Sequence, residues 1–173
     1  NLYLDVPPGS TGPDLRALRA KIDGLSPSDN PYDIAQTTVS YLRSSAFTYS
    51  TDVTDINCGE RSIAECFAHF KRGYCQYYAS TMVMLMRMEG IPARYVQGFL
   101  PGERDAATGV ETIRYSNSHA WVEVFFPGYG WITFDPTNRG VGGFNLVPVA
   151  VAGDIWQVCR AVTKPATGAP ACC

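Results

Sequence analysis

The strongest constraint on the fold of this chain is a change of sequence pattern near residue 90. Before Gly90 and Pro92, long stretches rich in Leu, Met and Ala are bounded by helix caps, whereas after them short aromatic and β-branched runs alternate with Pro-Gly turns. Helices that come first and strands that follow are typical of α+β proteins, in which consecutive strands pair with one another. The sequence therefore predicts an α+β fold with N-terminal helices and an antiparallel β-sheet.

Local start and stop signals place four helices. Asn30 and Pro31 form a strong N-terminal cap, and Gly90 closes the last helical stretch. Alternating methionines at 82–88 resemble a strand, but the length and composition of the stretch favour a helix with the methionines in the core. We expect helices at about 13–23, 31–45, 60–70 and 75–88.

The strands and the wider organisation follow from turn signals. We expect strands at about 93–100, 110–115, 120–126, 131–134 and 146–151. Residues 1–30 are predicted to form an extended lead-in with a short helix, 31–163 a single domain, and 164–173 a flexible tail.

Composition narrows the class of protein. Of the 173 residues, 46% are hydrophobic and 17% are charged, which excludes a disordered chain. The net charge is −2 with no block of like charge, so we expect no nucleic-acid partner. No apolar run is long enough to span a membrane. The chain begins with Asn1, so any signal or membrane segment is expected to lie outside this fragment, and membrane attachment only through such segments.

Cys75 is the first candidate for chemistry. It follows Gly73 and Tyr74 and opens an apolar helix. The positive end of a helix dipole lowers the pKa of a thiol and favours the reactive thiolate. Taken alone, the pattern is more typical of a buried structural cysteine. A nucleophile also needs a base, and the chain has two histidines, His69 and His119.

His119 is the better candidate base, because it opens a strand on the face opposite apolar Ala120, Val122, Val124 and Phe126. Asp135 closes the next strand and is the candidate group that orients the imidazole. The two side chains share a face only if facing partners have residue numbers with an even sum. A four-residue loop at 127–130 gives an odd sum, so we predict a three- or five-residue loop or a bulge.

The segments GYCQYYASTMVMLMRMEGIPARYVQGF and SHAWVEVFFPGYGWITFDPT resemble the core of the transglutaminase-like superfamily. The resemblance runs from about Cys75 to Thr137. It implies a papain-like fold with Cys75 on the central helix and His119 and Asp135 on neighbouring strands, so that 31–163 is the catalytic domain. The chain is most similar to a bacterial branch, which implies an extracytoplasmic domain of a membrane protein. Gln76 departs from the pattern, since an acidic residue is frequent there, and so does Asn138.

The resemblance implies an enzyme that carries out thiol-dependent acyl transfer through a Cys75 thioester. The partner would be a protein or peptide that bears glutamine or another amide, with an amine as acceptor. A cysteine peptidase or amidase acting on protein or cell-wall peptides would use the same residues. A noncatalytic binding module on the same fold is the alternative from another class.

The remaining site residues stay open at this point. The backbone N–H of Cys75 is the expected oxyanion donor, and Tyr49, Asn57 and Gln76 are unranked candidates for the second. Tyr74, Gln76 and Trp121 are candidates for the substrate cleft. Cys58, Cys66 and His69 do not have a usual zinc spacing, and no calcium-loop pattern is present, so we expect no metal and no cofactor.

The six cysteines complete the expectations. A nucleophilic Cys75 has to be a free thiol, so we expect it to lie outside any disulfide bond. Cys58 and Cys66 are then the expected bridge, since their segments are close in sequence. Cys172 and Cys173 fall in the predicted tail.

Overall fold

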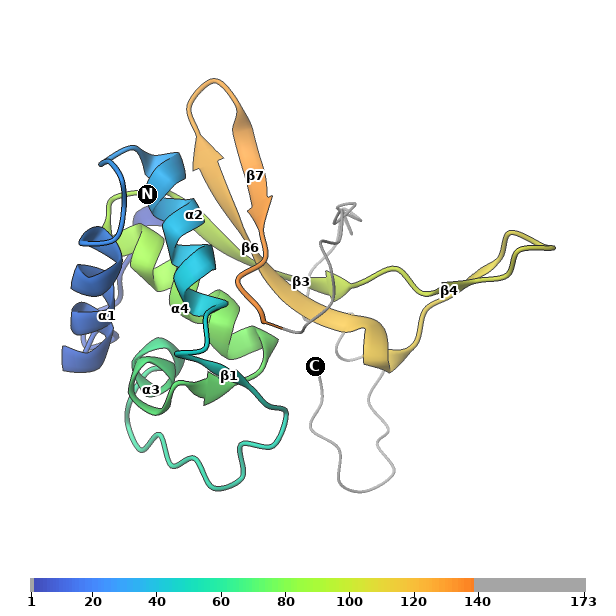
Figure 1. Ribbon diagram of the computed structural model, residues 1–173, viewed down its shortest axis with the longest axis horizontal. Coiled ribbons are helices and arrows are strands. Elements are labelled where there is room, and N and C mark those ends of the chain that lie inside the picture. The colour runs from blue at the N-terminus through green and yellow to red at the C-terminus, as the bar shows by residue number, and fades with distance from the viewer. Residues whose placement is uncertain (1, 139–173) are drawn as a thin grey trace.

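The computed structural model describes residues 2–138 of the chain. Four helices and a three-stranded sheet make up its body (Figure 1). The helices are α1 (Pro13–Asp23), α2 (Pro31–Leu42), α3 (Ile63–Phe70) and α4 (Cys75–Met88). The α+β prediction is confirmed, and the predicted strand at 146–151 lies outside the described residues.

The three-stranded antiparallel sheet has the order β3 (Ala93–Phe99), β6 (Ser118–Phe126) and β7 (Gly130–Phe134). Helix α4 packs against β3 and β6. The predicted apolar face of β6 is part of the core that this packing buries. The expectation that the helix at 75–88 lies against an antiparallel sheet is therefore confirmed.

Two small β-structures complete the fold. Strands β1 (Thr48–Tyr49) and β2 (Arg72–Gly73) pair in parallel just before α4. Strands β4 (Glu103–Arg104) and β5 (Glu111–Thr112) form a hairpin between β3 and β6 that reaches away from the helices (Figure 1). Short 3₁₀ helices lie at η1 (Leu2–Leu4) and η2 (Tyr115–Asn117). No helix among residues 2–138 is long and apolar enough to cross a membrane.

The predicted strand at 110–115 is the main correction to the fold. Only Glu111–Thr112 are extended and paired, and their partner is the equally short β4. The apolar residues of this stretch, Val110, Ile113 and Tyr115, are all exposed. The strand-like composition was misleading because, within residues 2–138, the segment pairs only with β4 and has no sheet face on which to bury these side chains.

Helix α1 is held by a carboxylate that comes from α3. Gly12 caps α1 without a side chain. The buried carboxylate of Glu65 accepts the backbone N–H groups of Gly12, Asp14 and Leu15 at 3.0, 3.0 and 2.8 Å. Glu65 thus caps the positive end of α1 from another helix. The approach is so close that a Cβ at Gly12 would lie 2.2 Å from the carboxyl carbon of Glu65.

Replacing Glu65 with Ala should lower the free energy of unfolding by about 2 kcal/mol, because it leaves buried N–H groups of α1 without their acceptor. Urea denaturation would measure the change. Glu60→Ala, an exposed acidic residue on the same approach to α3, is the matched control and should cost less than about 0.5 kcal/mol. Equal effects of the two substitutions would contradict the capping role.

Candidate active site

His119 and Asp135 lie on the same face of the sheet. Phe126 pairs with Gly130, so the turn between β6 and β7 contains three residues, 127–129. The residue numbers of facing partners on β6 and β7 therefore have an even sum, as predicted. Asp135 follows β7 on the face that carries His119. The Nε2 atom of His119 lies 2.8 Å from Oδ2 of Asp135. The predicted loop length and the predicted pairing are both confirmed.

The electrostatics of the His119–Asp135 pair indicate which imidazole nitrogen of His119 carries the hydrogen. Burial raises the pKa of Asp135, but hydrogen bonds from His119 and Thr137 and the nearby imidazole outweigh it, and the net pKa lies below the usual value. An ionised Asp135 needs a donor, so Nε2 of His119 carries the hydrogen. Nδ1 is then the basic nitrogen. It is buried and has no hydrogen-bond partner in the described part of the chain.

Cys75 occupies the first position of α4. The residue before it, Tyr74, provides no side-chain cap, and the first turn holds no acidic residue. Cys75 is fully buried and belongs to the same core cluster as Ala120, the neighbour of His119 on β6. Helix α4 packs against β6, the strand that carries His119.

The expectation that Cys75 lies outside any disulfide is wrong. Cys75 is disulfide-bonded in this structure. The chemistry is consistent, because a thiolate favoured by a helix N-terminus is also the species that enters disulfide exchange. The structure therefore holds Cys75 in an oxidised state that cannot act as a nucleophile.

Trp121 lies next to His119 on the same face of β6. Its ring is nearly parallel to the imidazole, with centroids 6.4 Å apart. Gly98, which faces His119 across the sheet, leaves room for the indole, since a Cβ there would lie 2.8 Å from its ring. Trp121 is 4% exposed, so in this structure it packs beside the imidazole rather than opening to solvent.

Further along this face, charges are paired. A guanidinium nitrogen of Arg94 lies 2.6 Å from Oε2 of Glu123. The guanidinium carbon of Arg94 lies 4.2 Å from the ring centroid of Trp131, over the ring face. Glu123 is buried and pairs with Arg94, while the carboxylate that contacts His119 is that of Asp135. The cluster fixes β3, β6 and β7 together beyond the site.

The other predicted site residues lie around the start of α4. The ring of half-buried Tyr74 meets that of Tyr77 edge-on, with ring centroids 5.0 Å apart. Burial raises the pKa of Tyr74. Gln76 is half-buried in the first turn of α4. Tyr49 pairs through its backbone with Gly73, two residues before the cysteine. Each of these positions stays a candidate for the cleft or the oxyanion hole.

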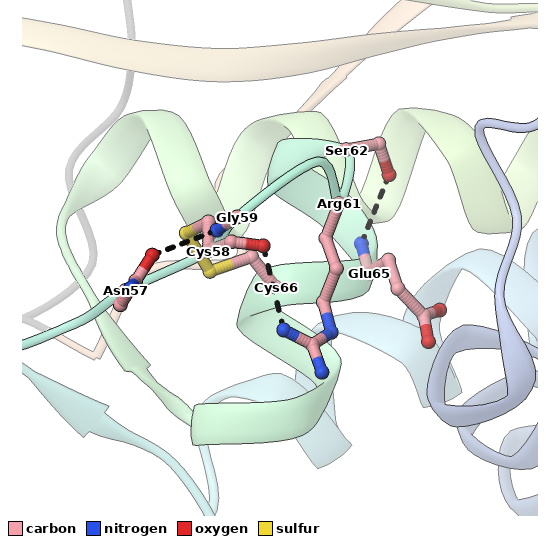
Figure 2. The surroundings of a disulfide bond; sticks show 7 residues. All are labelled: Asn57, Cys58, Gly59, Arg61, Ser62, Glu65 and Cys66. Carbon is pink, nitrogen blue, oxygen red and sulfur yellow. Dashed lines mark hydrogen bonds between the residues drawn. A yellow bond between two sulfur atoms is a disulfide. The ribbon is translucent and has the colours of Figure 1, made fainter.

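Asn57, the third candidate donor, belongs to a cross-linked loop. Its amide oxygen accepts the N–H of Gly59, next to the Cys58–Cys66 disulfide (Figure 2). The predicted disulfide is confirmed. It fastens this loop to α3, and Arg72 of β2 forms an ion pair with Asp55 of the same loop. The loop is thereby anchored to the segment that leads into Cys75.

His69, the second histidine, is on the surface. Its Nδ1 lies 2.9 Å from Asp14, and both side chains are exposed. Within residues 2–138, no group of three or more His, Cys, Asp or Glu side chains is arranged to hold a metal ion.

Thr137 is the residue of this site that sequence reasoning missed. Its N–H and its hydroxyl both donate to Oδ1 of Asp135, at 2.9 and 2.7 Å. The signal was present in the sequence, since an Asp followed two residues later by Thr favours such a local turn.

Comparisons with known proteins identify the family of this chain. The family model of the transglutaminase-like superfamily matches residues 19–136. The uncharacterized protein YebA of Bacillus subtilis is 38% identical over 141 residues, which cover 79% of this chain and 19% of that protein. A protein-glutamine gamma-glutamyltransferase of Pseudomonas aeruginosa is 40% identical over 69 residues, 40% of this chain and 10% of the relative. The chain thus spans at most about a fifth of the length of these two relatives.

A solved structure shares the fold. The periplasmic domain of TgpA from Pseudomonas aeruginosa superposes with a TM-score of 0.65 at 27% identity, covering 78% of this chain and 45% of that one. The family match extends over more than half of the chain and includes Cys75, His119 and Asp135. The chain belongs to the transglutaminase-like superfamily.

Proposed function

We propose that this chain catalyses thiol-dependent acyl transfer from a glutamine side chain of a protein or peptide, with Cys75 as nucleophile, His119 as base and Asp135 as the orienting carboxylate. The observation that carries the proposal is the hydrogen bond between the buried imidazole of His119 and the partly buried Asp135, which leaves Nδ1 as the basic nitrogen. A buried imidazole held in this tautomer is suited to take a proton from a thiol.

The first half of the reaction forms a thioester. Nδ1 of His119 takes the thiol proton, and Sγ of Cys75 bonds to the amide carbon of the donor. The resulting oxyanion is stabilised by the backbone N–H of Cys75, in the first turn of α4. The C–N bond then breaks, and the imidazolium gives its proton to the departing ammonia. Asp135 stays ionised and stabilises the imidazolium.

The second half releases the acyl group. An amine bonds to the thioester carbon, His119 accepts a proton from that amine, and the Cys75 sulfur leaves. The product is an isopeptide or secondary amide. Water in place of the amine gives deamidation by the same steps.

Three observations support this activity and the location of the domain. One relative bears the name protein-glutamine gamma-glutamyltransferase, and a structural relative is a periplasmic domain. The Cys58–Cys66 disulfide is of a kind that forms and persists outside the cytoplasm. We therefore place this domain outside the cytoplasm, as part of a larger bacterial membrane protein.

Cys75→Ala should reduce incorporation of a fluorescent primary amine into a glutamine-rich acceptor protein by a factor on the order of 10³ or more, because it removes the sulfur on which the proposed thioester forms. The double variant Cys58→Ala/Cys66→Ala is the control. It loses a disulfide but keeps the nucleophile, so it should retain incorporation. Activity that survives Cys75→Ala would sink the assignment of the nucleophile.

The same assay separates the acceptors. Release of ammonia or cleaved peptide without amine incorporation would mean that water is the acceptor and that the chain is a hydrolase. No reaction of any of these kinds from the reduced wild type, under conditions where the fold is intact, would favour a binding module.

Activity should depend on reduction of Cys75, because a sulfur in a disulfide bond cannot form a thiolate. Amine incorporation would be measured after incubation at graded thiol–disulfide ratios, with alkylation and mass spectrometry to report the fraction of Cys75 that is reduced. The curve of amine incorporation should follow the curve of the reduced fraction of Cys75, both in wild type and in Cys58→Ala/Cys66→Ala. Full activity at a ratio where Cys75 resists alkylation would contradict the prediction.

A further inference from the structure

The carboxylate of Asp135 is held on both of its oxygens. Oδ2 contacts His119, while Oδ1 accepts two hydrogen bonds from Thr137, one from the backbone N–H at 2.9 Å and one from the hydroxyl at 2.7 Å. Thr137 is itself buried, at 6% exposure. The imidazole of His119 thus binds one oxygen of the Asp135 carboxylate, and the two donors of Thr137 bind the other.

This arrangement is needed because of where Asp135 lies. Strand β7 ends at Phe134, so the ladder hydrogen bonds of the sheet stop one residue before the carboxylate. Pro136 follows and has no N–H to offer. Thr137 is therefore the first residue after Asp135 whose backbone can return a hydrogen bond to it, and its hydroxyl adds a second.

We propose that Thr137 is a positioning residue for the acyl-transfer reaction, which acts by fixing the rotation of the Asp135 carboxylate so that Oδ2 faces Nε2 of His119. The inference rests on the proposed function for the roles of Cys75, His119 and Asp135. Thr137 does not touch the reacting atoms.

The charges around Asp135 explain why neutral donors serve this purpose. The imidazole of His119 is the titratable neighbour that acts on Asp135 from β6. Glu123 on the same strand face is paired with Arg94 of β3. Thr137 stabilises the ionised carboxylate without adding a cation, which would oppose the formation of the imidazolium.

The test compares Thr137→Val with Thr137→Ser. Val keeps the shape and the backbone N–H but removes the hydroxyl, so kcat for amine incorporation should fall about tenfold with KM nearly unchanged. Ser restores the hydroxyl and should return kcat to within about twofold of wild type. Thr133→Val is the control. Thr133 lies on β7 opposite Glu123 of β6 and is not part of the site. Melting temperatures of all variants would accompany the rates.

A second measurement does not depend on activity. The carboxyl ¹³C signal of Asp135, followed against pH, should titrate at higher pH in Thr137→Val than in wild type, because a donor to the ionised form is lost. The acidic limb of kcat should move to higher pH in the same variant, and Ser should reverse both shifts.

The outcomes separate the two claims. If wild type is active and Thr137→Val keeps its kcat and its Asp135 titration, the positioning role is overturned. A loss of kcat that Ser fails to rescue, together with a lowered melting temperature, assigns Thr137 a merely structural role and also overturns it. If the titration shifts while wild type transfers no acyl group, the hold on Asp135 stands and the proposed function fails.

Discussion

The pairing of β6 with β7 is the constraint on which the candidate site depends. Side chains alternate between the two faces of a strand, so one extra or missing residue in the connecting turn would move Asp135 to the face opposite His119. The turn at 127–129 has the length that keeps them together. The rest of the site follows from this choice, because the carboxylate selects the tautomer of His119 and so decides which nitrogen remains basic.

Much of this was predictable from the sequence, and the reasons are local. The caps around Asn30 and the start of α4 at Cys75 depend on residues next to each other, and the parity of the β6–β7 pairing followed from two residue numbers. The cap on α1 was not predictable in this way. Its acceptor, Glu65, lies about fifty residues away, and Gly12 gives no sign of it. The same limit applies to the exposed residues of 110–115, because a local sequence pattern does not show whether another element packs over a strand.

The oxidation of Cys75 shows a different limit. Sequence reasoning treated the count of cysteines as a pairing problem and reserved one sulfur for catalysis. A thiol that is activated for attack on a carbonyl is activated for disulfide exchange as well, so the chemical argument for a nucleophile does not by itself fix its redox state. The Cys58–Cys66 pair behaves as the sequence suggests because its two residues lie close together along the chain and a helix holds one of them.

The contact between Glu65 and α1 bears on how the chain can be dissected. The lead-in before residue 31 looks dispensable when judged by its prolines and glycines. Yet three of its backbone N–H groups are the partners of a carboxylate buried within α3. A fragment trimmed to begin at α2 would keep that charge in an apolar setting and remove the groups that solvate it. Such a fragment would have to admit water at Glu65, so we expect the smallest autonomous unit to include α1.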